Sequence, residues 1–296
     1  MAKRLLSIVC AIVIFMMAWG MLSLTDVFGE KAEAAAKLNG TVFCAPLDNF
    51  DPNAYGSGQG FGPRSVSGGS SWHAAIDYGR DYGTSIYPIY EGKVVKKGYD
   101  TGGTDYYGAG HYITIQHDLG NRTIYSHYQH MNAASTYNVG DFVTPDNVIG
   151  HVGHSGDENY SGSKMGCHLD IRIMEGGPYP WGLLYSSQVA STTGSYESAT
   201  NTSGITYYNP AKVLDGTIKF NIAPIIVLDV SEATEGKLWI RGWAFDPDNT
   251  SQALAIHVYV RDNSNTLSWV GSTTANTLRQ DVDDVYQCGN AHGFDA

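Results

Sequence analysis

Histidine and aspartate side chains occur in this chain at spacings that suit a bound metal ion. His73 and Asp77 lie four residues apart, and His168 and Asp170 lie two apart. On a β-strand, side chains two residues apart project from one face, so His168 and Asp170 would be presented together. Imidazole and carboxylate donors suit zinc, whereas Ca²⁺ and Mg²⁺ prefer oxygen alone. The pattern predicts a zinc site with one position left open for water.

A further histidine, His127, stands at the end of an alternating segment that begins at Arg122. Two histidines beside a metal ion can move protons and stabilise the oxyanion of a reacting carbonyl. We therefore group His127 with the four residues above. Four other histidines of this region are interpreted as strand or loop surface residues; they are His111, His117, His130 and His151. His154 lies in a loop that should border the groove and is interpreted as an exposed loop residue, with a substitute metal ligand as the alternative.

β-Strands must position these side chains. Between about Gly60 and His151, short alternating segments are separated by Gly pairs and Asn/Asp clusters, which is typical of an antiparallel sheet. The clearest strand is Cys167–Ile173, in which apolar and polar residues alternate throughout. We predict an all-β fold with an antiparallel β-sheet core and a groove, and a small C-terminal β-sandwich-like module. Glycine-rich segments around residues 98–110 and 153–166 are expected to wall the groove.

The segments around the candidate residues have distinctive sequences in a fixed order. They include Phe61-Gly-Pro-Arg-Ser65, Trp72-His-Ala-Ala-Ile-Asp-Tyr-Gly79, Ile113-Thr-Ile-Gln-His117, Ile124-Tyr-Ser-His127, Ile149-Gly-His-Val-Gly153 and Gly166-Cys-His-Leu-Asp170. Together they resemble the lysostaphin-type (LytM-like) zinc endopeptidases over about residues 60–216. The resemblance implies a compact β-sheet core of the duplicated-hybrid-motif kind with a groove. It also implies that the substrate is a peptide cross-link or stem of bacterial peptidoglycan.

The resemblance implies a role for each candidate residue as well. His73 and Asp77 match two zinc ligands of that family, and Asp170 stands where the family has its third ligand, a histidine. His127 and His168 match the two catalytic histidines. One of them would take a proton from water, and the other would donate a hydrogen bond to the oxyanion. The implied cofactor is one Zn²⁺ ion.

The aspartate at position 170 leaves two interpretations open. A carboxylate oxygen lies as far beyond Cβ as the near nitrogen of histidine, so Asp170 can serve as the third ligand. A site with two carboxylates would leave Zn²⁺ formally neutral, so bound water would be a weaker acid. Alternatively, Arg172 shares the strand face and neutralises Asp170 in an ordinary ion pair. The chain would then be a catalytically degenerate member of the fold that binds wall peptide or a partner protein.

Outside the peptidase-like region, the composition predicts further segments. Residues 37–59 form a lead-in, and residues 176–207 are rich in Ser, Thr and Gly and are interpreted as a surface insertion. Residues 221–296 contain four predicted strands, at 225–230, 238–245, 255–261 and 267–272, with little room for closing strands. We expect Trp239, Trp243 and Trp269 to pack inside this module rather than to form a glycan-stacking surface.

The N-terminal residues 1–36 predict export. Lys3 and Arg4 precede an apolar run at residues 5–24, and small residues follow at 34–36. This order describes a cleaved secretory signal, although the run is long enough to remain as a membrane anchor. We expect the protein to be extracytoplasmic, and to contact a membrane only through residues 5–24 if the signal is retained.

Net charge bears on the binding partners of the protein, and cysteine content bears on its disulfides. The 296 residues include 18 basic and 29 acidic residues and carry a net charge of −11, which excludes nucleic acid as an expected partner because phosphate binding needs a positive surface. Beyond the predicted signal there are three cysteines, Cys44, Cys167 and Cys288. A Cys44–Cys167 disulfide and separate buried thiols are both compatible with an exported protein.

Overall fold

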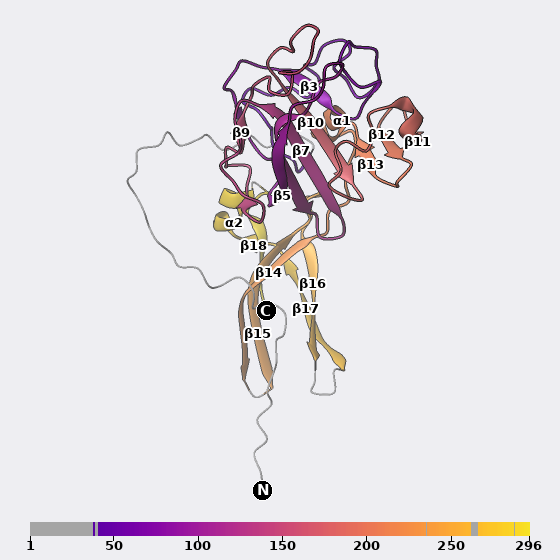
Figure 1. Ribbon diagram of the computed structural model, residues 1–296. Coiled ribbons are helices and arrows are strands. Elements are labelled where there is room, and N and C mark those ends of the chain that lie inside the picture. Colours follow the sequence, from indigo (N-terminus) through magenta and orange to yellow (C-terminus); the bar gives the residue numbers. More distant parts are fainter. Residues whose placement is uncertain (1–37, 39–40, 235, 262–265, 287) are drawn as a thin grey trace, which may run out of the picture. The chain divides into compact units, whose positions relative to one another are not determined.

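A computed structural model describes residues 38, 41–234, 236–261, 266–286 and 288–296. The predicted signal or anchor at residues 1–36 lies outside the described residues. Among those residues, no helix is long and apolar enough to cross a membrane. The described chain divides into two compact units, with the boundary between Ala223 and Pro224. Figure 1 shows that both units are built mainly from strands, as the all-β prediction required.

The larger unit is organised around one antiparallel sheet. Its central strands follow the order β5 (Gly92–Asp100), β6 (Gly110–Asp118), β7 (Thr123–Met131) and β10 (His168–Glu175), each next to its neighbour in this order. Strand β8 (Phe142–Val143) pairs with the outer edge of β5. In Figure 1, β5, β7 and β10 run through the middle of this unit.

Strand β10 connects the sheet to the candidate site. One of its edges pairs with β7, and the other pairs first with the short strand β3 (Ile76–Gly79) and then with β13 (Thr206–Tyr208). The apolar side chains of β10 are fully buried in the core, as its alternation predicted, together with those of β6; they are Leu169, Ile171 and Ile173 with Ile113 and Ile115. The polar residues of β10 therefore face the opposite side of the sheet.

Short elements complete the unit. They are β1 (Gly62–Pro63), β2 (Trp72–His73), β4 (Ser85–Ile86), β9 (Gly150–His151), the 3-10 helix η1 (Ser186–Gln188), β11 (Val189–Thr193), β12 (Ser198–Asn201) and α1 (Pro210–Leu214). The segment 176–207, expected as a surface insertion, contributes β11 and β12 to the sheet beside β13. Its Ser and Thr residues are compatible with strands, and Ala199 is fully buried.

The smaller unit contains two sheets. Strands β14 (Ile225–Thr234), β15 (Lys237–Phe245), β19 (Ala291–Asp295) and β18 (Thr277–Leu278) form one sheet in that order, and β16 (Leu254–Arg261) pairs with β17 (Leu267–Ala275). Ile240, Ile256 and Phe294 meet in one apolar cluster. Helix α2 (Gln280–Tyr286) packs in a second cluster.

Two expectations for this unit were wrong. The last residues do supply a closing strand, because β19 lies between β15 and β18. Only Trp243 is packed inside as expected, whereas Trp239 and Trp269 are 37% and 62% exposed.

In the larger unit, Cys44 and Cys167 are not joined by a disulfide within the described chain.

Candidate metal centre

Sheet register brings the two predicted aspartate ligands together. Asp77 on β3 lies directly opposite Asp170 on β10. His73, at the end of β2, is fully buried, and its Nε2 lies 3.2 Å from Asp77 Oδ1 and 3.4 Å from Asp170 Oδ2. The donor atoms of these three residues lie within 4.8 Å of one another. Residues that are far apart in the sequence thus form one compact group of an imidazole and two carboxylates.

The hydrogen bonds of His73 determine which nitrogen faces this group. Nδ1 lies 3.1 Å from the carbonyl oxygen of Gly60, and because a carbonyl only accepts, Nδ1 carries the proton. In the neutral ring, Nε2 therefore directs a lone pair at two carboxylates. Although burial lowers the pKa of His73, Asp77 and Asp170 raise it above its usual value. This position attracts a cation, either a proton or a metal ion.

Asp77 has one oxygen ready for such a cation. Arg64 Nη1 donates to Asp77 Oδ2 at 3.2 Å. Asp77 Oδ1 is buried and, among the described residues, has no hydrogen-bond partner. Although burial raises the pKa of Asp77, His73 holds it below its usual value, so the carboxylate is ionised. A buried, ionised oxygen without a hydrogen-bond donor is the strongest local indication of a metal site.

Asp170 is far more fully engaged. Arg172 donates to both of its oxygens, from Nε and Nη2, each at 3.2 Å. Gln129 Nε2 donates to Oδ2 at 2.8 Å. Although burial raises the pKa of Asp170, Arg172 holds it well below its usual range. The ion pair that the sequence left as an alternative is therefore formed, and the same oxygen still faces His73.

The donor set fits a zinc ion. With metal–ligand bonds of about 2.0 Å, two ligands of a tetrahedral site lie about 3.3 Å apart. The separations of 3.2 Å and 3.4 Å from His73 Nε2 to the two carboxylates agree with that value. One nitrogen and two oxygens also suit zinc better than Ca²⁺ or Mg²⁺. His73, Asp77 and Asp170 can therefore hold a metal ion of this kind.

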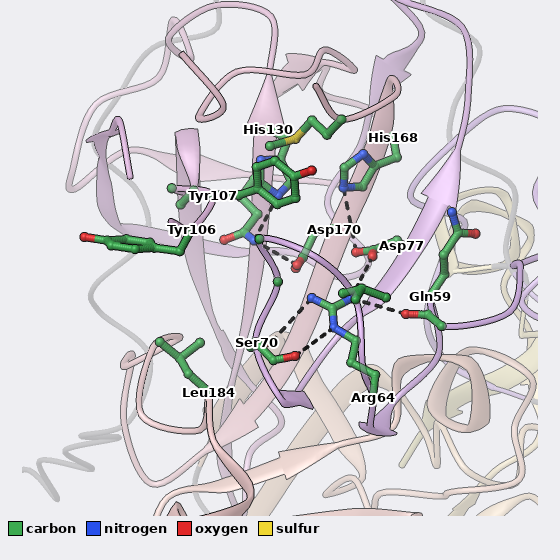
Figure 2. A pocket seen from close by; sticks show the side chains of 18 of the residues that line it. Gln59, Arg64, Ser70, Asp77, Tyr106, Tyr107, His130, His168, Asp170 and Leu184 are labelled. Carbon is green, nitrogen blue, oxygen red and sulfur yellow. Dashed lines mark hydrogen bonds and ion pairs between the residues drawn. The ribbon is translucent and has the colours of Figure 1, made fainter. Parts of the chain in front are cut away.

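His168, one of the two predicted catalytic histidines, lies beside His73, Asp77 and Asp170. Its Nδ1 donates to the carbonyl oxygen of Gly166 at 2.7 Å, and its Nε2 lies 3.8 Å from Asp77 Oδ1. The ring of His130 lies against it, with the ring centroids 4.7 Å apart. Figure 2 shows His130, His168, Asp77 and Asp170 around one pocket.

The structure does not bring His127 to this pocket. His127 is fully buried, with Nδ1 2.8 Å from Thr114 Oγ1 and Nε2 3.2 Å from Gln129 Oε1. Its ring lies beside Trp181, and it is absent from the residues that line the cavity. Burial, assisted by Arg172, lowers the pKa of His127 to about 3. His127 thus holds Gln129 in place by a hydrogen bond and does not line the pocket.

His130, rather than His127, lines the pocket. It was expected at the surface but is only 6% exposed, and it lines the pocket. A register shift between β6 and β7 and a φ of 62° at His130 mark a β-bulge, which redirects its side chain. Burial, assisted by His168, lowers the pKa of His130 to about 4. The available sequence signal was that Tyr128-Gln-His130 repeats the Tyr-x-His pattern of Tyr125-Ser-His127.

The pocket is large enough for a segment of peptide. Its volume is about 630 Å³, within the usual range for ligand sites. Its walls come from four parts of the larger unit, namely residues 57–70, 106–109, 165–168 and 181–185, with Asp77, Gln129, His130, Asp170 and Arg172 among its remaining residues. The predicted glycine-rich segments thus contribute at residues 100, 106–109 and 165–166, whereas the contributions of 57–70 and 181–185 were not foreseen.

Comparison with known proteins shows which family the region around the site is similar to. Residues 71–179, which contain every candidate residue discussed above except Arg64 and Trp181, match peptidase family M23. This part of the chain is similar to peptidase family M23. Trp181 lies two residues beyond the matched M23 region, and Arg64 lies before it. Lysostaphin from Staphylococcus simulans is 31% identical over 105 residues, which is 35% of this chain and 20% of lysostaphin.

Solved M23 structures give similar coverage. The catalytic domain of lysostaphin from S. simulans is 25% identical, and the match covers 43% of this chain and 85% of that domain with a TM-score of 0.35. A variant catalytic domain of the M23 protein EnpA from Enterococcus faecalis is 26% identical, with coverage of 44% and 89% and a TM-score of 0.32. The chain thus spans about one fifth of the length of the lysostaphin sequence that it matches.

Proposed function

We propose that this protein is an exported zinc metalloendopeptidase that hydrolyses peptide bonds of bacterial peptidoglycan. The observation that carries the proposal is the convergence of His73 Nε2 with Asp77 and Asp170 beside two further imidazoles. The M23 match supports peptide hydrolysis. The similarity to lysostaphin, an antimicrobial peptidase, supports a bacterial wall substrate. Export through residues 1–36 and a catalytic domain at residues 60–216 are part of the same proposal.

In this proposal His73, Asp77 and Asp170 hold the zinc ion. When bound, zinc supplies a Lewis acid beside the scissile carbonyl and makes water more acidic. Arg64 fixes Asp77 by holding its second oxygen, so that Oδ1 stays directed at His73. The carbonyl of Gly60 fixes the tautomer of His73 in the form that ligates through Nε2.

In this proposal His130 and His168 accept and donate the protons of the reaction. Each holds its Nδ1 hydrogen against a backbone carbonyl, so Nε2 of each ring carries the lone pair. In the structure, Nε2 of His130 accepts a hydrogen bond from Gln129 Nε2 at 3.3 Å, which a substrate or water would replace. The lowered pKa keeps His130 neutral at pH 7, as an acceptor requires. One of the two imidazoles takes a proton from the attacking water and returns it to the leaving amine. This assignment replaces His127 by His130 as the partner of His168.

One observation favours a second candidate, a degenerate member of the family that binds wall peptide without hydrolysis. Both carboxylates of the donor set are paired with arginines, Asp77 with Arg64 and Asp170 with Arg172. With a neutral His73, the four charges sum to zero without a metal ion. A protein that keeps the pocket but not the metal would need this neutralisation.

Hydrolysis of insoluble peptidoglycan separates these candidates. We expect the purified full chain to release new amino groups from the wall, and we expect a chelator to abolish the release. Asp77→Asn should lower the rate by at least 100-fold, because it removes a zinc ligand. Asp118→Asn, an exposed aspartate at the end of β6, is the matched control and should act like the parent. Wall binding without any release by the parent would instead support the degenerate candidate.

A further inference from the structure

Arg172 is a buried cation held at three points. It is 4% exposed and lies in the middle of β10. Nε and Nη2 contact the two oxygens of Asp170, and Nη1 donates to the carbonyl oxygen of Pro180 at 2.6 Å. All three guanidinium nitrogens of Arg172 therefore have a partner. These contacts fix the guanidinium beside Asp170. A guanidinium stays charged at any ordinary pH.

These contacts occupy the oxygen that the metal would need. Asp170 Oδ2, which faces His73, already accepts hydrogen bonds from Gln129 at 2.8 Å and from Arg172 at 3.2 Å. A carboxylate oxygen has two lone pairs, so both are in use. A metal ion bound to this oxygen must share or displace one of the donors. It must also lie close to the fixed positive charge of Arg172, which repels it.

Asp77 provides the contrast within the same site. Its Oδ1 has no hydrogen-bond partner among the described residues, and Arg64 contacts only the other oxygen. The side chain of Arg64 is also 13% exposed, against 5% for Arg172. Asp77 is therefore prepared for a metal ion, whereas Asp170 already has a permanent counter-ion.

We propose that Arg172 is a resident cation that competes with the metal ion for Asp170. It stabilises the metal-free protein and lowers the affinity of the site for zinc. The inference rests on the proposed zinc site. It adds that the fraction of protein with zinc bound depends on the zinc concentration, because arginines already neutralise both carboxylates of the metal-free site. Arg172 acts through Asp170 and is a positioning residue.

Zinc affinity measured by competition with a chromophoric chelator tests this inference on the full chain. We expect Arg172→Gln, which removes the charge but can still donate a hydrogen bond, to bind zinc at least tenfold more tightly than the parent. Arg172→Lys keeps the charge and should stay within about threefold of the parent, because the charge sets the competition. Arg122→Met is the matched control, since Arg122 pairs with Glu175 at the far end of β10. Its zinc affinity should equal that of the parent.

The thermal melting temperature provides an independent readout. Without metal, Arg172→Gln should melt below the parent, because it leaves Asp170 as an uncompensated buried charge. Added zinc should then raise its melting temperature by more than it raises that of the parent. If Arg172→Gln does not fold without metal, zinc should restore its folding, because zinc neutralises the same carboxylate. Failure of zinc to restore it would contradict the inference.

The outcomes separate this inference from the proposed function. A parent that binds zinc, together with an Arg172→Gln protein that binds it equally or more weakly, overturns the competition while the zinc site stands. A parent and variants that bind no zinc at millimolar concentrations overturn the zinc site and the competition together.

Discussion

The three histidines nearest the two metal-site carboxylates share one hydrogen-bond arrangement. In each, Nδ1 donates to a backbone carbonyl, so Nε2 carries the lone pair; the pairs are His73 with Gly60, His130 with Ser155, and His168 with Gly166. Backbone carbonyls cannot rotate away as side chains can, so they fix each ring in one tautomer. Metal ligation and proton acceptance both need this tautomer.

Replacing His130 and His127 in turn tests the reassignment between them. We expect His130→Ala to lower the hydrolysis rate by about 100-fold or more while the protein keeps its zinc, because a proton acceptor is lost. His127→Ala should instead lower the free energy of unfolding by about 1–3 kcal/mol, because Thr114 and Gln129 lose a buried partner. Rates, zinc content and urea unfolding of both variants give the comparison. A His130→Ala enzyme of parental rate would contradict our assignment.

At the scale of elements, strands β7 and β10 show what the sequence could and could not predict. The alternation in Cys167–Ile173 was sufficient to place Asp170 and Arg172 on one face, because strand geometry leaves no other arrangement. The β-bulge at His130 was not predictable, since a bulge is defined by the partner strand and not by the strand itself. The alternation in β7, considered without its partner strand β6, therefore led us to choose His127 and not His130.

The contacts of Asp170 show the same limit. The sequence alone left ligation and an ion pair with Arg172 as alternatives. The surroundings of Asp170 and Arg172 include Gln129 and Pro180, which come from other segments and are brought close by the fold. The strands within the predicted insertion at residues 176–207 could not be foreseen for a related reason. Its strands become part of the sheet because β10 offers a free edge to β13.

The hairpin of β6 and β7 also predicts an acid-sensitive stability. His117 is fully buried, contacts the carbonyl oxygen of Glu91 and Ser126 Oγ, and has a pKa lowered to about 4 by burial. In the unfolded chain its pKa returns to about 6.5. Below pH 6.5 the unfolded state therefore binds the extra proton, so the free energy of unfolding should fall by up to about 1.4 kcal/mol per pH unit until pH 4.

A matched variant isolates this contribution. His117→Gln removes the titrating group from β6 but leaves the pocket residues intact. Urea unfolding of parent and variant between pH 7 and pH 4 should show a shallower pH dependence for His117→Gln. Equal slopes would mean that His117 is not the buried neutral imidazole described here.

At the scale of the whole molecule, the metal site belongs to the larger unit alone. Every donor atom and every labelled pocket residue in Figure 2 lies between residues 59 and 184, on the N-terminal side of the boundary at Ala223. The smaller unit has its own apolar clusters, and its exposed Trp239 and Trp269 lie on different strands. Among the described residues, one group of side chains could hold a metal ion, so we expect one metal ion per chain.

Zinc content of the purified full chain tests the central claim most directly. After equilibrium dialysis against buffer with excess zinc, elemental analysis corrected for the free zinc should find about one zinc per chain in the parent. Asp77→Ala should retain none, because it removes the oxygen that has no other partner. Asp118→Ala, at the end of β6, should retain the parental amount. A folded parent that stays metal-free in the presence of zinc would contradict the claim that this is a zinc peptidase.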